Sequence, residues 1–596
     1  MLKRTCTCGD PRKDQAGETI TLSGWVNTYR DQGKSLVFID LRDRYGMTQV
    51  IFDGEDTPEE VMELGSSLRR EDVISVEGIV RLRDGKPNAK LETGEIELVA
   101  QKIEVINRTA KLPILPDDHD ADKIGEEHRL RYRYIDLRRP RMQNILALRH
   151  KITQFTRNFF TDNGFLEIET PLLITPTPEG ARDFIVPSRH QAGQWYALPQ
   201  SPQIFKQILM IAGCDKYMQI CKCLRDEDPR ADRQAEFTQI DLEMSFVEQD
   251  DVLAIMGEFA KKLFQEVGGI DIGDLPQMSW KDAMNEYGSD RPDIRFDLKL
   301  TDVTALASKT DFKVFTEACT AGGSVKAMRV PGGAEKLTRK MTDGFAEIAK
   351  TYGAGGLPVV KYQGGEFATG VAKFVEPIKD ELVEALGLED GDIVLFGVGS
   401  YRVACTSLGE VRLAVAKVLD LVPEGLFRGL WVIDFPMFDW NEDAQRWISE
   451  HHPFTAPLAS HLDILESDPR NCLSSGYDLV INGAELGGGS IRIHTPEVQS
   501  KVFELLGLSQ EEAEDKFGFL LNALRYGAPP HGGVAFGLDR LVMMMIGTTN
   551  IRDVIAFPKT QTGADLMCEA PGKADPAQLE ELGIIMREPV DSTEQA

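Results

Sequence analysis

The 596-residue sequence lacks any long apolar run: no stretch approaches the roughly 18–20 consecutive apolar residues that span a membrane. Its amino terminus, MLKRTCTCGDPRKD, has no apolar core and so does not resemble a signal peptide. These two absences predict a soluble, cytoplasmic protein with no membrane partner.

Cysteine pairs with zinc-binding spacing are also missing. The nine cysteines include two close pairs, Cys6 with Cys8 and Cys221 with Cys223, and neither pair has the two-residue gap typical of zinc sites. Cys221 and Cys223 alternate on an expected strand, so we expect them to pack as small apolar groups. The odd number of cysteines fits a reducing compartment.

An excess of positive charge is lacking too, because the net charge is −28. Such a chain is a poor unspecific binder of nucleic acid, since phosphate contacts supply most of that affinity. The charge is nevertheless uneven: residues 123–157 contain ten Lys and Arg but three acids. This basic island is either a solvated helix face or a hinge that contacts phosphate.

The chain is long enough for several domains, because single cores rarely grow past roughly 250–300 residues. Residues 18–108 contain strand-like runs separated by turn signals, with a helical stretch at 58–70 between the third and fourth strands. Five strands and one helix in this order predict an OB-fold β-barrel, which commonly stacks single-stranded bases on aromatic side chains.

Residues 201–246 carry the densest chemistry. Residues 217–224 and 236–246 alternate apolar and polar side chains, as half-buried strands do. Between them, residues 225–233 are a run of alternating charge that includes Pro229. We therefore expect two antiparallel strands joined by a long charged loop.

On this pair of strands, Arg225, Glu227, Asp241 and Glu243 should lie on or beside one face. Arginine pairs with carboxylate or phosphate oxygens, and carboxylates hold ammonium groups or hydrated Mg²⁺. The pattern thus fits a ligand that is both anionic and cationic. The alternative is a solvated hairpin with surface ion pairs.

Three segments resemble the motifs of class II aminoacyl-tRNA synthetases, in the family's order. Residues 164–171 (GFLEIETP) are similar to motif 1, residues 224–241 (LRDEDPRADRQAEFTQID) to the aspartyl form of motif 2, and residues 532–540 (GGVAFGLDR) to motif 3. The chain resembles the bacterial-type aspartyl-tRNA synthetases along nearly its whole length. This resemblance implies a multidomain α/β protein: an N-terminal OB-fold barrel and a catalytic domain with an antiparallel sheet, interrupted by an inserted α+β domain of the GAD type.

Domain boundaries follow from the motifs and from a glycine-rich segment that contains none of them. We expect an OB-fold anticodon-binding domain (1–110), a basic hinge (111–141), a catalytic domain in two parts (142–287 and 429–561), the inserted domain (288–428) and a C-terminal extension (562–596). In the family, the helix expected at 142–162 and the following strand form a dimer interface, which implies a homodimer. A helix buried within one subunit is the alternative.

The resemblance implies an aspartate–tRNA ligase, which activates L-aspartate with ATP to aspartyl-AMP and transfers it to the 3′ end of tRNA(Asp), with Mg²⁺ as cofactor. Both steps chiefly need alignment and charge stabilisation, so no general base is assigned. Relaxed family members also charge tRNA(Asn), and in the family the loop that contains Gln32 differs between strict and relaxed enzymes. Gln32 matches neither the strict nor the relaxed pattern, so tRNA(Asn) stays open as a partner.

Two more distant alternatives are a catalytically inactive tRNA-binding paralogue and a ligase that uses ammonia. The presence of Arg225, Glu227 and Arg540 argues against the first, and the OB-fold segment argues against the second.

The family's functional residues carry over onto this sequence as four sets. The catalytic set is Arg225, Glu227 and Arg540. The aspartate-binding set is Glu179, Ser201, Gln203, Lys206, Arg225, Asp241, His451 and Arg492. The ATP-binding set is Arg225, Asp226, Glu227, Gln234, Glu485, Gly537, Leu538, Asp539 and Arg540, with Glu485 holding Mg²⁺ through ATP. The anticodon-binding set is Arg30, Gln32, Phe38 and Gln49.

Some of these residues could have a purely structural role instead of a ligand-binding one. Ser201 before Pro202 is a good helix start, and Gln203 and Lys206, three residues apart, then share a face. A lysine there could equally be an ordinary surface residue. Phe38 is as consistent with the barrel core as with base stacking.

Two further patterns concern charge and metal binding. Arg540 falls in the first turn of a helix that should begin at Leu538, the unfavourable end for a cation, which suggests an anionic partner. His451 and His452 would point different ways on a strand, which weakens a two-histidine metal site.

Overall fold

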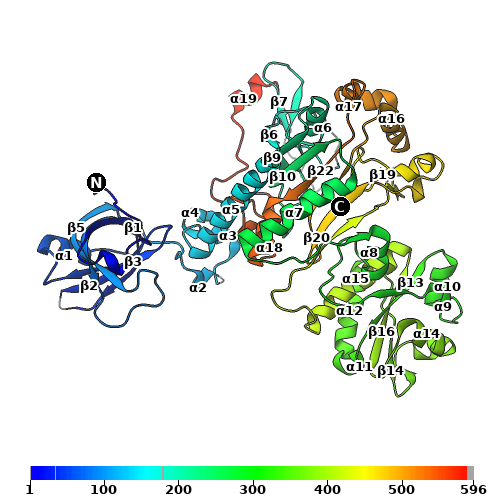
Figure 1. Cartoon of the computed structure of the whole chain (residues 1–596), viewed down its shortest axis with the longest axis horizontal. Coiled ribbons are helices and arrows are strands. Elements are labelled where there is room, and N and C mark those ends of the chain that lie inside the picture. Colours follow the sequence, from blue (N-terminus) through cyan, green and yellow to red (C-terminus); the bar gives the residue numbers. More distant parts are fainter. Residues whose placement is uncertain (1, 34, 122, 177–179, 587–596) are drawn as a thin grey trace. The chain divides into compact units, whose positions relative to one another are not determined.

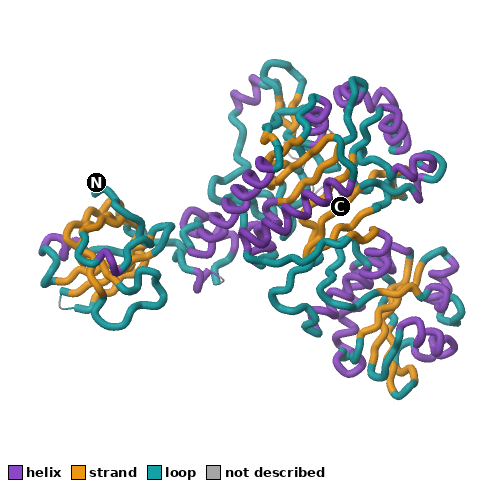
Figure 2. Tube along the Cα trace, viewed as in Figure 1, coloured by secondary structure: helices purple, strands orange, loops and turns teal. Residues whose placement is uncertain are grey.

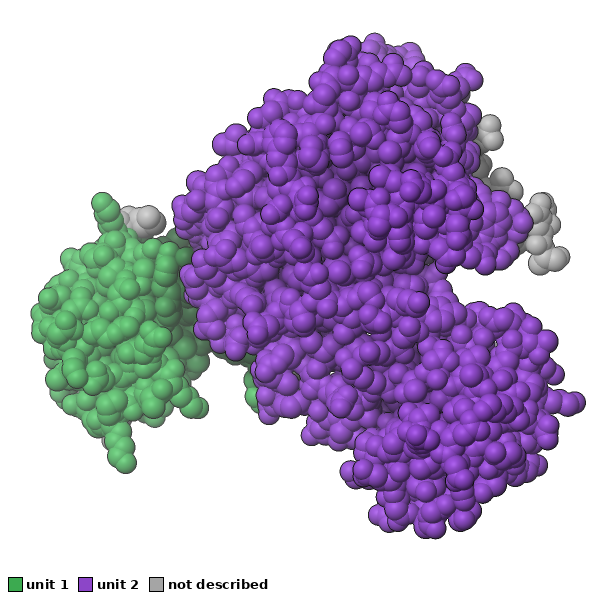
Figure 3. Space-filling model, turned by 45° about the vertical axis from the view of Figure 1, so that its right-hand side comes forward, with its two compact units in different colours: residues 1–144, 566–568 green, residues 145–565, 569–596 purple. Residues whose placement is uncertain are grey.

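The computed structural model describes residues 2–33, 35–121, 123–176 and 180–586. The chain divides into two compact units, residues 1–144 with 566–568 and residues 145–565 with 569–596 (Figure 3). Figures 1 and 2 show the helices and strands of each unit. Within the described residues, no helix is long and apolar enough to cross a membrane.

A closed five-stranded barrel forms most of the first unit, in the order β1-β2-β3-β5-β4. Its strands are β1 Thr19–Asp31, β2 Leu36–Arg42, β3 Met47–Asp53, β4 Val73–Leu82 and β5 Ile96–Asn107, and α1 Glu59–Ser66 lies between β3 and β4 in the chain. Val37, Ile39 and Leu41 alternate along β2 and are buried in one apolar cluster. The predicted OB-fold is confirmed.

Short helices follow the barrel: α2 Asp118–Ala121, α3 Glu126–Arg131 and α4 Arg133–Asp136. Asp136 is buried and pairs with Arg133 at 2.6 Å and with Arg139 at 2.7 Å. Both arginines are buried too, because each is matched by this carboxylate. Arg133 and Arg139 therefore belong neither to a solvated helix face nor to a phosphate-contacting surface, and both interpretations of the basic island are wrong for these two residues.

An eight-stranded sheet organises the second unit, in the order β11-β17-β20-β21-β22-β10-β9-β6. Its strands are β6 Leu166–Glu167, β9 Lys216–Leu224, β10 Glu236–Ser245, β11 Gln277–Ser279, β17 Gly429–Ile433, β20 Gly476–Ile481, β21 Ala484–Ile491 and β22 His531–Gly537. The two edge pairs, β11 with β17 and β6 with β9, are parallel, and the inner pairs are antiparallel. The predicted antiparallel catalytic sheet is confirmed.

Long helices pack on this sheet: α5 Pro140–Asp162 and α7 Gln249–Gly268, with α18 Leu538–Ile546 following β22. Phe259 of α7 centres an aromatic cluster. Its ring centroid lies 4.7 Å from that of Phe160 and 5.4 Å from those of Phe159 and Phe536. The cluster joins α5, α7 and β22, and Figure 1 shows α5 and α7 in front of the sheet. Helix α5 therefore buries the apolar face that its sequence predicts.

A separate sheet lies between β11 and β17 in the chain, in the order β12-β13-β16-β14-β15. Its strands are β12 Leu300–Asp302, β13 Ser324–Val330, β14 Val359–Gln363, β15 Glu366–Ala368 and β16 Asp392–Gly399; its helices are α9 Thr304–Ala307, α10 Lys313–Thr320, α11 Gly333–Lys336, α12 Arg339–Thr351, α13 Ala372–Val375, α14 Lys379–Leu386 and α15 Tyr401–Val418. Ile393 and Val394 of β16 belong to two different apolar clusters, so both faces of this sheet are covered. It lies inside the predicted insertion, whose boundaries stay a prediction.

The remaining elements surround the main sheet: α6 Gln203–Ile211, α8 Trp280–Tyr287, α16 Pro496–Leu505, α17 Gln510–Leu524, α19 Pro576–Glu581 and the hairpins β7 Ile185–Pro187 with β8 Trp195–Ala197 and β18 Phe438–Asn441 with β19 Arg446–Ser449. Helix α6 begins one residue later than predicted. Pro202 is its N-cap rather than its first residue, and Ser201 Oγ accepts from the backbone N–H of Gln203 at 3.2 Å.

Candidate active site

The centre of the site is the antiparallel pair of β9 and β10. The charged residues 225–235 connect the two strands, as the sequence predicts. Side chains two residues apart share one face of a strand, so Phe237, Gln239, Asp241 and Glu243 point to the same side. Two adjoining pockets lie on that side of β10.

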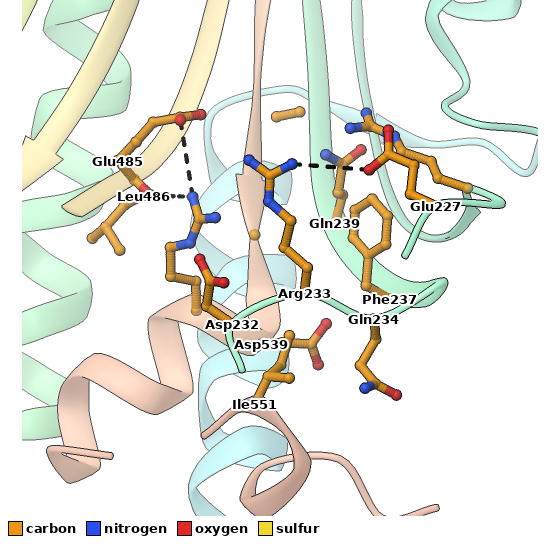
Figure 4. A pocket seen from close by; sticks show the side chains of 14 residues that line it. Glu227, Asp232, Arg233, Gln234, Phe237, Gln239, Glu485, Leu486, Asp539 and Ile551 are labelled. Atoms are coloured by element: carbon orange, nitrogen blue, oxygen red, sulfur yellow. Dashed lines mark hydrogen bonds and ion pairs between the residues drawn. The ribbon is translucent and has the colours of Figure 1, made fainter. Parts of the chain in front are cut away.

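The first pocket collects most of the predicted ATP-binding residues: Arg225, Glu227, Gln234, Glu485, Gly537, Asp539 and Arg540. Figure 4 shows Glu485 on one side of it and Glu227 with Phe237 on the other. Among the described residues, two of the predicted ATP-binding residues, Asp226 and Leu538, do not line this pocket. Leu538 is buried, and the backbone N–H of Asp226 donates to the carbonyl oxygen of Arg182 at 3.0 Å.

Arg540 lies in the first turn of α18, as predicted. Its Nη1 donates to the carbonyl oxygen of Glu485 at 2.5 Å and lies 4.0 Å from Oε2 of the same residue. The pKa of Glu485 is raised by burial and by the nearby Asp478, and the opposing charge of Arg540 only partly offsets this rise. A guanidinium has five N–H donors, so Arg540 keeps donors for anionic oxygens in the pocket.

Asp539 and Gln234 connect this pocket to the surrounding elements. Asp539 accepts from the Thr238 backbone N–H at 2.9 Å and from Arg149 Nη1 at 2.5 Å, which ties α18 to β10 and α5. The Gln234 Oε1 accepts from the Lys559 backbone N–H at 2.9 Å. Its Nε2 is buried without a hydrogen-bond partner among the described residues.

The second pocket collects the predicted aspartate-binding residues: Ser201, Gln203, Lys206, Arg225, Asp241, His451 and Arg492. The eighth residue of that set, Glu179, lies outside the described residues. Arg225, Glu227, Gln239, Glu485 and Ala535 line both pockets. The two pockets therefore meet at these five residues.

Four buried charged side chains meet beneath the second pocket. Lys206 Nζ lies 2.8 Å from Asp241 Oδ1 and 3.2 Å from Glu243 Oε2. Arg492 Nε lies 3.0 Å from Glu243 Oε1, and its Nη2 donates to Oε2 at 3.2 Å. None of the four is more than 2% exposed, and buried charges are stable only when paired in this way.

The pKa directions of the two carboxylates differ. Burial raises the pKa of Asp241, with Lys206 opposing it. Burial also acts to raise the pKa of Glu243, but the charges of Arg492 and Lys206 outweigh it and lower that pKa, so Glu243 stays ionised. Gly533 makes room for this carboxylate, because a Cβ there would lie 2.2 Å from Glu243 Oε2.

His451 and His452 both line the second pocket, in an irregular segment after β19 rather than on a strand. The strand expected there is therefore absent, and the two rings have different partners: His451 lies near Asp478 and His452 contacts Arg492. Burial disfavours the charged form of His451, but the nearby Asp478 outweighs burial, and the pKa of His451 is raised. The Oδ1 of Asp478 lies 3.8 Å from the Nε2 of His451. Burial and Arg492 lower the pKa of His452, whose Nε2 lies 2.7 Å from Arg492 Nη1 and accepts from it.

The predicted anticodon residues gather on the outer face of the barrel. Phe38 pairs with Arg30 in the β1–β2 register, is half-buried and lies outside the barrel's core cluster. Gln32 is exposed just after β1. Gln49 is buried, and its Oε1 accepts from Arg83 at 2.7 Å and Arg30 at 3.3 Å. A base edge would have to compete with these arginines for Gln49.

Several pocket residues were not predicted. Gln239 is one of them, and the alternation along β10 gave a usable signal, since it places Gln239 on the same face as Asp241. Glu243, which the sequence analysis did place on that face, lies beneath the second pocket and lines neither pocket. Asp478 and Glu450 are others, and both affect the pKa of His451. The sequence offered no comparable signal for Glu450, because it lies in an irregular loop.

Comparison with known proteins agrees with this geometry. The family model for class II tRNA synthetases (D, K and N) matches residues 125–561, and the model for the OB-fold nucleic acid binding domain matches residues 20–106. The chain belongs to the class II tRNA synthetases. This synthetase is 49% identical to the aspartate–tRNA ligase of Bacillus licheniformis, over 98% of each chain. It is 48% identical to the aspartate–tRNA(Asp/Asn) ligase of Bacillus subtilis (strain 168), over 99% of this chain and all of the relative.

Solved structures share the fold of the synthetase. The asparaginyl-tRNA synthetase of Pyrococcus horikoshii complexed with asparaginyl-adenylate superposes with a TM-score of 0.60 and 18% identity, over 94% of this chain and 99% of that one. The aspartyl-tRNA synthetase of Entamoeba histolytica gives a TM-score of 0.57 and 18% identity, over 94% and 91%. At this identity the likeness concerns the fold alone.

Proposed function

We propose that this synthetase is an aspartate–tRNA ligase. The observation that carries the proposal is the buried pair of cations, Lys206 and Arg492, at the floor of the second pocket. The two cations face Glu243, which stays ionised, and Asp241, whose pKa burial raises, so they suit a substrate side chain that is itself a carboxylate. An amide side chain would leave buried donors poorly matched, which is how such sites reject close analogues. The names of the two Bacillus relatives support this assignment.

In the first step, the α-carboxylate of aspartate attacks the α-phosphorus of ATP, the bond to pyrophosphate breaks, and aspartyl-AMP forms. Arg225 lines both pockets and would bridge the substrate carboxylate and the α-phosphate. Arg540 would hold the distal phosphates, and Glu227 and Gln234 would position ATP. In the second step, the 3′-hydroxyl of the terminal tRNA ribose takes the aspartyl group. Alignment and charge stabilisation carry both steps.

Mg²⁺ fits the carboxylates of this site as an ion carried by ATP. Glu485 and Asp478 both line the second pocket, and carboxylate oxygens are the protein ligands that Mg²⁺ prefers. The described residues contain no group of three or more His, Cys, Asp or Glu that could hold a metal by themselves. Glu485, with Asp478 beside it, would hold Mg²⁺ jointly with phosphate oxygens and water. When bound, the ion neutralises phosphate charge.

The partners follow from the same assignment. The barrel would bind the tRNA anticodon through Arg30, Gln32, Phe38 and Gln49. The protein would be a cytoplasmic homodimer that pairs through α5 and the motif 1 strand. Leu166, Leu172 and Leu173 support this surface, because each is more than half exposed in the single chain.

Amino-acid-dependent ATP–pyrophosphate exchange tests the amino acid. We expect exchange with aspartate and none above background with asparagine or lysine. Exchange driven by asparagine or lysine instead would refute the aspartate assignment.

A relaxed ligase that also charges tRNA(Asn) is the second candidate, favoured by the Asp/Asn name of the Bacillus subtilis relative. Charging of separate tRNA(Asp) and tRNA(Asn) transcripts with labelled aspartate distinguishes the two. Charging of the first alone means a strict enzyme, and charging of both means a relaxed one.

A further inference from the structure

Gln239 occupies the place where the two pockets meet, and the proposed function gives it no task. Of the five residues that line both pockets, Arg225, Glu227 and Glu485 are charged and Ala535 is apolar. Gln239 is therefore the uncharged polar side chain at the junction. The bond between the amino acid and the phosphate must form at this junction if each substrate fills its own pocket.

Two thiols hold Gln239 from the neighbouring strand. The Sγ of Cys223 lies 3.1 Å from Gln239 Oε1, and the Sγ of Cys221 lies 3.8 Å from the Gln239 carbonyl oxygen. The neighbouring Cys223 and burial both raise the pKa of Cys221, so its thiol keeps its proton. Cys221 and Cys223 thus do more than fill space: each presents an S–H donor to Gln239.

The contact with Cys223 sets which end of the amide faces the ligand. Because the thiol donates to Oε1, the Nε2 end is directed away from Cys223. Figure 4 shows the Gln239 amide beside Phe237 and facing the pocket that also holds Arg233 and Glu485. An amide donor placed there can contact an anionic oxygen without adding a charge of its own.

We propose that Gln239 is a further catalytic residue of this synthetase, whose Nε2–H donates to a non-bridging oxygen of the α-phosphate, and that Cys223 is the residue that positions it. The proposal rests on the proposed function. As the carboxylate oxygen bonds to phosphorus and pyrophosphate leaves, charge is redistributed over the phosphate oxygens. A preorganised donor stabilises that charge, and no proton is transferred.

Replacement of Gln239 tests the donor. Gln239→Met keeps the size and removes the amide, and we expect kcat of aspartate-dependent ATP–pyrophosphate exchange to fall about 100-fold, while the KM values for ATP and aspartate change much less. Gln239→Glu should fall further, because a carboxylate there repels the phosphate. The wild-type protein is measured in parallel: absence of exchange in the wild type refutes the proposed function, whereas wild-type rates in Gln239→Met refute this inference alone.

Replacement of Cys223 tests the positioning. Cys223→Ala should lower kcat several-fold, and Cys223→Ser, which restores a donor, should recover most of the loss. In the double variant Cys223→Ala/Gln239→Met, kcat should equal that of Gln239→Met alone, because the thiol acts through the amide. Cys472→Ala is the matched control, a buried cysteine that lines neither pocket, and should keep wild-type kinetics.

Additive effects of the two substitutions, or equal losses in Cys223→Ala and Cys223→Ser, would show that Cys223 has only a packing role and would overturn the positioning part. A Gln239→Met variant whose loss appears entirely in KM would overturn the catalytic part.

Discussion

Lys206 and Arg492 contact the two oxygens of one carboxylate: Lys206 Nζ lies 3.2 Å from Glu243 Oε2, and Arg492 Nε lies 3.0 Å from Glu243 Oε1. The two cations come from α6 and from the residue after β21, far apart in the chain. Glu243 thereby holds two like charges together in a buried place where they would otherwise repel each other. The pocket above them is thus preorganised for an anionic group.

Removal of the Lys206 charge should impair aspartate use. We expect Lys206→Met to lower kcat/KM for aspartate by about 10²–10³, because one preorganised cation is lost at the side-chain carboxylate. Steady-state ATP–pyrophosphate exchange measures the effect. Lys262→Met, at an exposed lysine that pairs with Glu258, is the control and should leave the kinetics unchanged. Equal kinetics in Lys206→Met and wild type would contradict the assignment.

Neutralisation of Glu243 should destabilise the catalytic domain. Glu243→Gln leaves Lys206 and Arg492 buried without a full counter-charge, which costs about 3–5 kcal/mol in comparable buried pairs. The measurement is the urea midpoint of unfolding, with Glu258→Gln on the surface as control. An unchanged midpoint for Glu243→Gln would mean that the charge network does not stabilise the fold.

The pH dependence has a definite sign. Because the folded pKa of Glu243 is lowered, its contribution to stability is present at neutral pH and is lost as pH falls through that lowered pKa. The wild type should therefore lose stability faster on acidification than Glu243→Gln. The two urea midpoints, followed from neutral to acidic pH, should converge, and parallel curves would contradict the account.

Truncation of Arg540 should affect ATP. We expect Arg540→Ala to lower kcat/KM for ATP in the exchange reaction by about 10²–10³, because its guanidinium, held at the Glu485 carbonyl oxygen, no longer contacts phosphate. Arg339→Ala, at a side chain 95% exposed on the inserted domain, serves as the control. If Arg540→Ala instead loses affinity for aspartate and keeps its KM for ATP, the assignment of Arg540 to the ATP phosphates is contradicted.

His451 should make aspartate binding weaken as pH rises. Asp478, Glu450 and Glu485 favour the protonated ring and keep its pKa raised despite burial, with neutral His452 beside it. The positive ring favours an anionic substrate, and that advantage disappears as pH rises through the raised pKa. KM for aspartate should therefore increase with pH in the wild type and vary less in His451→Asn. The same pH profile in both proteins would contradict a charged His451.

The barrel and the paired strands around the charged loop could be predicted, because periodicity and turn signals are local properties of the sequence. The antiparallel catalytic sheet was expected from the resemblance to the class II synthetases. The contact of Lys206 with Asp241 and Glu243 could not, since it joins a helix to a strand across the core. Nor could the burial of Arg133 and Arg139, which look solvated until Asp136 is placed between them. Local patterns find elements, whereas paired buried charges depend on tertiary contacts.

The most direct test of the account is charging of a tRNA(Asp) transcript with labelled amino acid in the presence of ATP and Mg²⁺. The account predicts that aspartate is esterified to the tRNA and that asparagine is not. Charging with asparagine, or no charging with aspartate by a correctly folded protein, would contradict it.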